Sequence, residues 1–274
     1  MVNSINSINI VTDCHDDNAR GRVMTRFAAL FPRVHVGFVG VKSDIEAAGN
    51  LVDLMDANLG QRAIVFVNVA PRTKSGRHNG SPFGHVRLGK VDIVSTIEGN
   101  ALSLLQKVVG ELTVGVFDVS EVLKRLGIEY IDEQYLPASQ FRSFEFAPRL
   151  IHGLIKGVSF KSADFPSKNI APMPQAIWWQ DNFGNLKTTF TPSEAGFCRG
   201  SYEYDKGMRW LINDKPFHFN CYESLKDIPH NEIGLVVGSS GYKKHRFLEI
   251  MKKGGSAAQA LDLTSGETIK KDLN

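Results

Sequence analysis

The chain has 274 residues, with 32 Lys and Arg against 29 Asp and Glu, a formal charge of +3, and 42% hydrophobic residues. This composition is typical of a globular protein and excludes collagen-like, coiled-coil and wholly disordered chains. The positive surplus is small and its densest run, residues 243–246, is short, so we expect no nucleic-acid partner. No stretch approaches the roughly 18 apolar residues of a membrane span, so we expect no membrane partner.

The cysteines are Cys14, Cys198 and Cys221. An odd, sparse set without a C-x-x-C motif indicates neither a disulfide framework nor a structural zinc site. The first residues have neither the positive region nor the apolar stretch of a signal peptide. We therefore expect reduced thiols, no metal and a cytoplasmic protein.

The first half of the chain alternates apolar runs with amphipathic segments. Strands are expected over 8–12, 34–41, 63–69 and 91–96, and helices over 22–31, 43–59 and 101–109. Ser43 is the expected N-cap of the second helix, with Glu46 as its capping-box partner. Strand–helix–strand order predicts βαβ units around a mostly parallel sheet. The fold class is therefore α/β, with a Rossmann-like α/β sandwich domain over residues 1–166.

The pattern changes near residues 166–174, where three prolines within nine residues indicate a linker. Beyond it come short apolar runs separated by turn residues. These candidate strands cover 176–180, 186–190, 209–212, 217–221 and 233–237. Short, evenly punctuated strands favour a small β domain, so we expect a β-barrel over residues 167–274.

A polar cluster, Thr12-Asp13-Cys14-His15-Asp16-Asp17, follows the first expected strand. In open α/β sheets, ligands bind beyond the carboxyl ends of strands. A carboxylate there can accept hydrogen bonds from both hydroxyls of a ribose, and three carboxylates can hold a cation. Capping of the next helix is the alternative interpretation for Asp16 and Asp17. Two further loops at the same edge are expected over 71–89, with His78 and His85, and over 98–100.

Two clusters stand out in the second half. The run from Trp178 to Asn185 contains turn pairs that a plain β-hairpin explains, but it also places Phe183 inside the turn. An exposed Phe beside an amide and a carboxylate suits a flat heterocycle. The run from Val237 to Tyr242 consists of small residues, which let backbone amides approach an anion, although a simple strand turn also fits.

Taken together and in this order, the clusters resemble the S-adenosylmethionine hydroxide adenosyltransferases, whose relatives include the fluorinases and chlorinases. The matching stretches are 12–13, Asp17 with Gly21, 71–77, 141–148, 181–185 and 238–242. The Asp-x-Phe-Gly-Asn run at 181–185 and the Ser-Ser-Gly-Tyr run at 239–242 are the most specific parts. The similarity extends over nearly the whole chain.

The resemblance implies a larger α/β domain, a smaller β-barrel domain and a homotrimer. It also implies S-adenosylmethionine or adenosine as the small-molecule partner, bound between neighbouring subunits, and no cofactor. The implied reaction is displacement at the ribose C5′ by water or hydroxide, which gives adenosine and L-methionine. By position, Asp13 would hold the ribose diol, Phe183 and Asn185 the adenine, and Asp181 and Ser239 the methionine moiety.

The remaining residues that the resemblance assigns to the site lie in the same stretches. Asp17, Thr73 and Tyr242 complete the expected substrate-binding set. Arg77 falls where the family has a catalytic Arg. Arg142 takes the place of the family's His, and Ser143 lies where the halogenating relatives approach their halide. Arg77, Arg142 and Ser143 are therefore the expected catalytic residues.

The sequence also departs from the family pattern, and three hypotheses follow. Ala70 replaces a catalytic carboxylate, and Ile97-Glu98-Gly99-Asn100 replaces a Pro-Asp-Asn-Gly run. The first hypothesis is a hydrolase of S-adenosylmethionine in which Arg77 aids the nucleophile. The second is a protein that binds S-adenosylmethionine or adenosine without catalysis. The third is a metal-dependent nucleoside hydrolase, because Asp13-x-x-Asp16-Asp17 loosely resembles that family's calcium loop.

Overall fold

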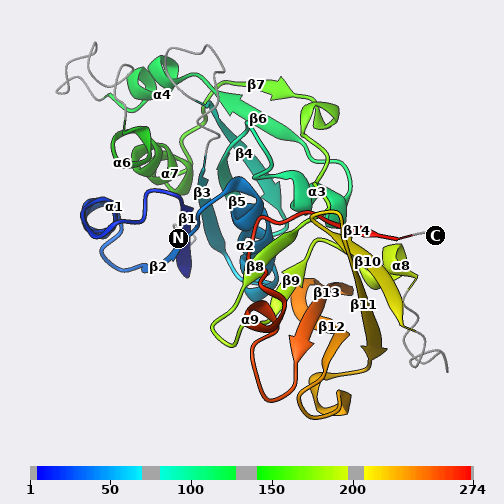
Figure 1. The fold of residues 1–274 in the computed structure, drawn as a ribbon. Helices are drawn as coiled ribbons and strands as arrows, with labels where there is room; N and C mark the ends of the chain where they lie inside the picture. The colour runs from blue at the N-terminus through cyan, green and yellow to red at the C-terminus, as the bar shows by residue number, and fades with distance from the viewer. Residues whose placement is uncertain (1–4, 70–80, 128–140, 197–206, 273–274) are drawn as a thin grey trace. The chain divides into compact units, whose positions relative to one another are not determined.

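The computed structural model describes residues 5–69, 81–127, 141–196 and 207–272. The chain divides into two compact units, Met1–Ala171 and Pro172–Asn274. Figure 1 draws their elements with the labels used below. We refer to them as the N-terminal and C-terminal units and describe each by itself.

The N-terminal unit is built on a seven-stranded sheet with the order β2-β1-β3-β5-β4-β6-β7. Its strands are β1 (Ser7–Thr12), β2 (His35–Gly40), β3 (Ala63–Asn68), β4 (Phe83–Leu88), β5 (Val91–Thr96), β6 (Val114–Phe117) and β7 (Ser162–Phe165). The four strands β2, β1, β3 and β5 are parallel, whereas β4 runs antiparallel to β5 and β6, and β7 antiparallel to β6. The expected mostly parallel α/β sheet is confirmed.

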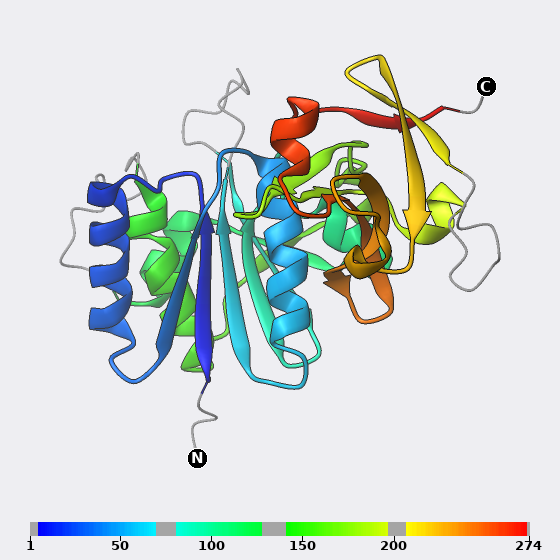
Figure 2. The ribbon, with the colours of Figure 1, turned by 60° about the horizontal axis from the view of Figure 1, so that its bottom comes forward.

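Helices cover both faces of this sheet (Figure 2). They are α1 (Asp17–Leu30), α2 (Asp44–Ala57), α3 (Ser103–Val109), α4 (Val119–Arg125), α6 (Arg142–Glu145) and α7 (Ala147–Ile155). Helices α1, α6 and α7 lie against one face, and α2 and α3 against the other. On the α1 face, Ile8 and Ile10 of β1 and Phe66 of β3 pack with Phe27 of α1 and Leu150 of α7. Every second strand residue thus faces the same helices, as the pleat of a strand requires.

Two parts of the N-terminal unit differ from the sequence expectation. Helix α1 begins at Asp17 and not at 22, because Oδ1 of Asp16 accepts hydrogen bonds from the backbone N–H groups of Asn18 and Ala19. The second half of the expected loop 71–89 is strand β4, which pairs with β5. At α2 the expected cap is confirmed, since Ser43 Oγ accepts from Glu46 N–H at 3.2 Å.

The C-terminal unit is a second seven-stranded sheet, with the order β14-β10-β11-β12-β13-β9-β8. Its strands are β8 (Ile177–Gln180), β9 (Leu186–Thr188), β10 (Met208–Ile212), β11 (Lys215–Tyr222), β12 (Ile233–Tyr242), β13 (His245–Lys252) and β14 (Ile269–Lys271). A bridge between Ala176 and Thr268, directly before the edge strands β8 and β14, joins the two ends of the sheet. The expected barrel is confirmed as a nearly closed sheet.

The barrel has its own hydrophobic core and two short helices, α8 (Pro192–Ala195) and α9 (Ala257–Leu261). Trp210 and Phe190 pack edge to face in that core, with ring centroids 4.9 Å apart. Leu186, Leu248 and Ile250 are fully buried around them. In the part of the chain that the structure describes, no helix combines the length and apolar character needed to cross a membrane.

Candidate functional site

The candidate site of the N-terminal unit lies where the strand order reverses. From β1 the chain passes to β2 on one side and later to β3 on the other, and ligands of open α/β sheets bind in the crevice at such a switch point. Asp13 directly follows β1 at this point, half-buried, and its backbone N–H donates to the carbonyl of Asn68 at 3.4 Å. The sheet therefore holds the Asp13 backbone at the position where the fold favours a ligand.

Thr12 and Asn68 fix the shape of this crevice edge. The hydroxyl of Thr12, which is 2% exposed, accepts hydrogen bonds from Nδ2 of Asn68 at 3.2 Å and from the backbone N–H of Cys14 at 3.1 Å. The last side chains of two neighbouring parallel strands are thus joined beside Asp13. Asn68 ends the β3 run in the sequence, but only the strand order shows that it neighbours Thr12.

The other two acids of the first polar cluster have different positions. Asp16 caps α1, as described above, and Asp17 is the exposed first residue of that helix. Asp17 lines a shallow concavity of about 630 Å³ along α1, together with Arg22 and Phe144. Asp13 is not among the residues that line this concavity. The capping interpretation therefore holds for Asp16, and the role of Asp17 in substrate binding stays a prediction.

Arg142, the first residue of α6, is held against the start of β4. Its Nη2 donates to the carbonyl of Ser81 at 2.6 Å, and its guanidinium lies 5.8 Å from the centre of the Phe83 ring. Burial lowers the pKa of Arg142, and the nearby carboxylate of Glu98 opposes this change. The guanidinium remains charged at neutral pH. Ser143, the next residue, is 5% exposed.

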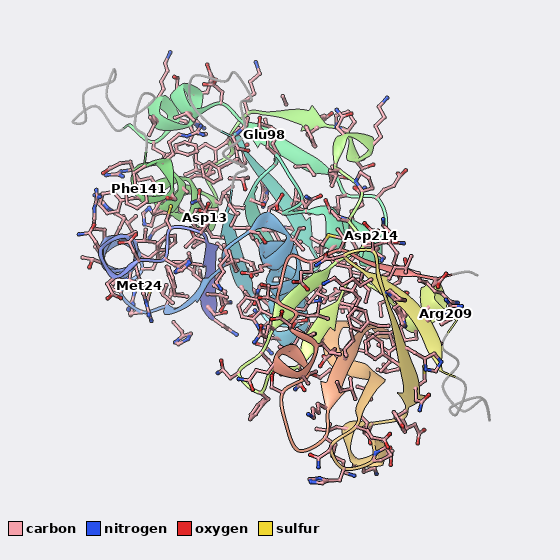
Figure 3. The ribbon with its side chains drawn as sticks, viewed as in Figure 1. Asp13, Met24, Glu98, Phe141, Arg209 and Asp214 are labelled. Carbon is pink, nitrogen blue, oxygen red and sulfur yellow. The ribbon has the colours of Figure 1, made fainter. Side chains whose placement is uncertain are left out.

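Glu98 belongs to the segment that follows β5, and this segment is anchored on both sides. The backbone N–H of Glu98 donates to Oγ of Ser81 at 3.2 Å. Two residues later, the backbone N–H and Nδ2 of Asn100 both donate to Oδ2 of Asp44, at 2.7 and 3.1 Å. Figure 3 labels Asp13, Glu98 and Phe141 among the side chains of this unit. Ser81 thus connects β4, the segment after β5 and α6, a role that sequence reasoning missed.

Several expected residues lie outside the described part of the chain: Ala70, Thr73, Arg77, His78 and the rest of the 71–77 stretch. Their roles stay predictions. His85 is not a loop residue, because it lies within β4, and its Nε2 pairs with Oδ1 of Asp92 at 2.7 Å. That contact engages a ring nitrogen that could otherwise act as a base.

The C-terminal unit contributes a tight turn between β8 and β9, built around Asp181. Its Oδ1 accepts hydrogen bonds from the backbone N–H groups of Phe183 and Asn185, both at 2.9 Å. Its Oδ2 accepts from Nδ2 of Asn185 at 2.9 Å. The Asp181 carboxylate therefore shapes the turn from within, and its contact with the methionine moiety stays a prediction.

This turn presents Phe183 to solvent. The Phe183 side chain is 80% exposed, which is unusual for a large apolar group. Gly184 has a φ of +78°, and a Cβ there would overlap the side chain of Ser256. The carbonyl of Gly184 accepts from the backbone N–H of Ala258 at 2.9 Å, so the turn rests on the start of α9. The exposed ring is consequently held on a fixed support and available for stacking on a flat ligand.

The Gly238–Tyr242 run forms a bulge in β12, where the pairing with β13 shifts register between Val237 and Gly241. Nη1 of Arg246 donates to the carbonyls of Ser239 at 2.9 Å and Gly241 at 3.3 Å. Ser239 is exposed, as a ligand contact requires. Tyr242, at the end of the strand, is half-buried under Lys243, whose Nζ lies 5.0 Å from the ring centre.

A hydrogen bond to the buried Ser240 connects the bulge to β9, the strand that follows the Asp181–Asn185 turn. Nζ of Lys187 donates a hydrogen bond to Oγ of Ser240, and Ser240 is 3% exposed. Lys187 lies opposite Glu249 on the neighbouring strand β13. Glu249 is 2% exposed, and a Cβ at Gly238 would overlap its carboxylate. A side chain at the start of the bulge would therefore force the carboxylate of Glu249 to move.

Among the described residues, no group of three or more His, Cys, Asp or Glu side chains is arranged to hold a metal ion. The Asp13-Asp16-Asp17 cluster that suggested a calcium loop is divided by the capping role of Asp16. These three acids therefore give the metal-dependent nucleoside hydrolase no structural support, and that hypothesis stays untested.

Comparison with known proteins gives one family match and several similar folds. Residues 175–270 match the sequence profile described as the SAM hydroxide adenosyltransferase C-terminal domain. A structure titled "uncharacterized conserved protein" from Thermotoga maritima aligns with a TM-score of 0.67 at 17% identity, covering 97% of this chain and 100% of the other. A "conserved hypothetical protein" from Thermus thermophilus aligns with a TM-score of 0.55 at 17% identity, covering 98% and 100%. No curated protein sequence matches the chain.

At this level of identity the two structures establish a common fold over both units, whereas the similarity to a named family is confined to the matched domain. The matched residues include the Asp181–Asn185 turn and the Gly238–Tyr242 bulge, which are the most specific parts of the resemblance noted in the sequence. Residues 175–270, the greater part of the C-terminal unit, are therefore similar to the C-terminal domain of the S-adenosylmethionine hydroxide adenosyltransferases.

Proposed function

We propose that the protein is an S-adenosylmethionine hydrolase that replaces methionine at the ribose C5′ with water or hydroxide and releases adenosine and L-methionine. The observation that carries this proposal is the family match over residues 175–270, which contain the exposed Phe183 and Ser239. Asp13 at the switch point of the N-terminal sheet supports it independently, because a carboxylate there suits a ribose diol.

For this reaction the main catalytic task of the protein is to position the nucleophile and the substrate. A bond forms between the water oxygen and C5′ while the C5′–sulfur bond breaks and its electron pair goes to sulfur. The sulfonium becomes the neutral thioether of methionine. When water is the nucleophile it releases one proton to the solvent, and when hydroxide is the nucleophile no proton is released. A positively charged sulfur is already a good leaving group, so alignment and partial desolvation of the nucleophile supply most of the acceleration.

In this proposal each site residue takes the role that the family resemblance gives it. Asp13 accepts hydrogen bonds from the ribose hydroxyls, Phe183 stacks on the adenine, and Asn185 borders the same base. Ser239, in the Gly238–Tyr242 bulge that Arg246 holds through two hydrogen bonds, contacts the methionine moiety. Asp181 holds the turn that carries Phe183, whether or not it also touches the ligand.

A second candidate function is binding of S-adenosylmethionine or adenosine without turnover. Two observations favour it. Ala70 lacks the carboxylate that the family has at this position, and the guanidinium of Arg142 is engaged by the carbonyl of Ser81. A cation held by a carbonyl is less able to act on a water molecule than one that faces the site.

One experiment separates the two functions. The purified protein is incubated with S-adenosylmethionine and the products are separated by chromatography, while calorimetry measures binding of S-adenosylmethionine and adenosine. Adenosine and methionine in equal amounts above the blank are expected for the hydrolase. Binding without products would establish the second function, and neither binding nor products would refute both. The Asp13→Asn variant is measured in parallel for both binding and product formation, and it should bind adenosine more weakly than the wild type.

The homotrimer is a separate part of the proposal. Light scattering on the eluting protein should then give three times the chain mass of 30.3 kDa. A monomeric mass at assay concentration, together with full activity, would show that a single chain forms the complete site.

A further inference from the structure

The carboxyl edge of the N-terminal sheet presents one cation and one anion close together, and both are fixed through the same residue. Nη2 of Arg142 donates to the carbonyl of Ser81 at 2.6 Å, and the backbone N–H of Glu98 donates to Oγ of Ser81 at 3.2 Å. Ser81 is 3% exposed. The guanidinium and the residue that bears the carboxylate therefore approach each other on a buried anchor.

The backbone that carries Glu98 and the guanidinium of Arg142 are both held in place by further contacts. Asn100 ties the segment after β5 to Asp44 through two hydrogen bonds. Arg142 is half-buried, with the Phe83 ring 5.8 Å from its guanidinium. The carboxylate of Glu98 also counteracts part of the effect of burial on the pKa of Arg142. The two opposite charges therefore lie near enough for the carboxylate to favour the charged form of Arg142.

This pair lies on the same sheet edge as Asp13. Asp13 follows β1, and Glu98 follows β5, with β3 between them. Two strand spacings amount to roughly 10 Å, a span that accommodates a ribose and the group attached to its C5′. A ligand whose ribose lies on Asp13 can therefore place its C5′ substituent toward the Arg142–Glu98 pair. On the other side, the residue two positions beyond the end of β2 is the exposed cation Lys42, whereas the residue two positions beyond the end of β5 is the carboxylate Glu98.

The charge of the pair matters because the ligand of the proposed function is a cation at sulfur. Arg142 alone would repel a sulfonium on this edge, whereas Glu98 offsets that repulsion. We propose that Glu98 is a specificity-determining residue, which makes this edge accept a positively charged sulfonium in preference to the corresponding neutral thioether. This inference rests on the proposed function, and it holds for a hydrolase and for a binding protein alike.

The test compares three ligands: S-adenosylmethionine has a methyl group and a positive charge at sulfur, S-adenosylhomocysteine has neither, and adenosine lacks the sulfur and the amino acid moiety. Calorimetry measures the dissociation constants of S-adenosylmethionine, S-adenosylhomocysteine and adenosine for the wild type and for Glu98→Gln. Loss of the carboxylate should weaken S-adenosylmethionine about 10-fold relative to S-adenosylhomocysteine, as expected for one charge at this range in a partly exposed site. Adenosine affinity should change less than about 2-fold, which also reports that the variant is folded.

Glu111→Gln is the matched control. Glu111 is exposed in the same unit and precedes β6, which starts at the opposite edge of the sheet. This variant removes the same charge and should leave the ratio of the two dissociation constants unchanged. Arg142→Met is the complementary variant. It should shift the ratio toward S-adenosylmethionine, and the effect of Glu98→Gln should be smaller in the double variant if the two charges act on one another.

The outcomes distinguish this inference from the proposed function. If the wild type binds none of the three ligands, the proposed function fails and the inference fails with it. If the wild type binds them but Glu98→Gln weakens both sulfur ligands equally, or neither, the inference is overturned while the proposed function stands. A ratio that changes equally in Glu98→Gln and Glu111→Gln would assign the effect to net charge and would likewise overturn it.

Discussion

Asp181 and Phe183 are neighbours in one turn, but the structure gives them opposite physical roles. Asp181 accepts three hydrogen bonds within the turn, whereas Phe183 is 80% exposed. One residue therefore contributes to folding and the other is available to a ligand. Such a division within three residues allows stability and binding to be measured separately.

Asp181→Ala should lower the free energy of unfolding by about 1 to 2 kcal/mol, because two backbone N–H groups and the Asn185 amide lose a charged acceptor. Urea denaturation followed by circular dichroism checks this. Unchanged stability would show that solvent replaces the carboxylate at no cost.

Phe183→Ala should leave the free energy of unfolding within about 0.5 kcal/mol of the wild-type value, because its ring is already in water. It should weaken adenosine binding at least about 5-fold, the lower end of what a stacked base contributes. Calorimetry with adenosine measures the effect. An affinity equal to that of the wild type would remove the ring from the base site.

At the level of elements, the hairpin of β4 and β5 owes part of its stability to a charged group on its surface. Asp92 accepts hydrogen bonds from Nε2 of His85 and from Nε of Arg87, both at 2.7 Å. Burial by itself raises the pKa of Asp92, but the hydrogen bonds and charges of His85 and Arg87 outweigh it and lower the pKa.

A lowered pKa in the folded state means that this carboxylate stabilises the fold when ionised. The contribution is fully present above the ordinary Asp pKa of about 3.9 and is lost as the pH falls through the folded value. Asp92→Asn should therefore reduce the free energy of unfolding by about 1 to 2 kcal/mol at pH 7. The difference from wild type should narrow below about pH 4.

Urea midpoints for the wild type and Asp92→Asn between pH 7 and pH 3 measure this difference, with Glu111→Gln as the exposed control in the same unit. If the difference in stability between the wild type and Asp92→Asn stayed constant from pH 7 to pH 3, the ionised form of Asp92 would not be what stabilises the hairpin.

For the whole molecule, the separate cores of the two units predict independent folding. The barrel buries its own apolar set around Trp210 and Leu248 and closes through the Ala176–Thr268 bridge. Residues 172–274 expressed alone should therefore unfold in one cooperative thermal transition. They should not hydrolyse S-adenosylmethionine, because Asp13 and Arg142 are absent. Near-ultraviolet circular dichroism and the product assay test both expectations, and a non-cooperative transition would show that the barrel needs the other unit.

The fold was predictable to the extent that local pattern decides it. Apolar runs predict three strands, and the observed strand ends lie within one or two residues of the predicted ranges 8–12, 63–69 and 91–96. Capping chemistry predicts the N-cap at Ser43, which the structure also shows. Strand β4 was missed because its residues include Gly84, His85 and Arg87, which do not resemble a buried strand. Pairing with β5 and β6 stabilises the strand conformation, which the composition of this segment does not favour by itself.

The candidate site was predictable only where one short segment contains it. Phe183 and Ser239 could be identified because a turn and a bulge are local features. The contact of Ser81 with Arg142 joins residues 61 positions apart, and no periodicity of the chain indicates such a pair. Placement of Glu98 beside the same anchor likewise depends on the order of strands in the sheet, which a single sequence does not specify.

The bulge in β12 has a consequence for how this barrel tolerates changes in length. Val237 lies opposite Leu248 and Gly241 opposite Arg246, so three residues of β12 face the single residue Phe247. Removing one of the three would exchange inward and outward side chains for the rest of the strand, because strand faces alternate residue by residue. Removing two would preserve the faces and leave a regular ladder without its protruding serine. The effect of a deletion here therefore depends on whether the number of residues removed is odd or even. An odd deletion reverses the faces of the strand end, whereas an even deletion that includes Ser239 keeps the barrel and removes the serine proposed to contact the ligand.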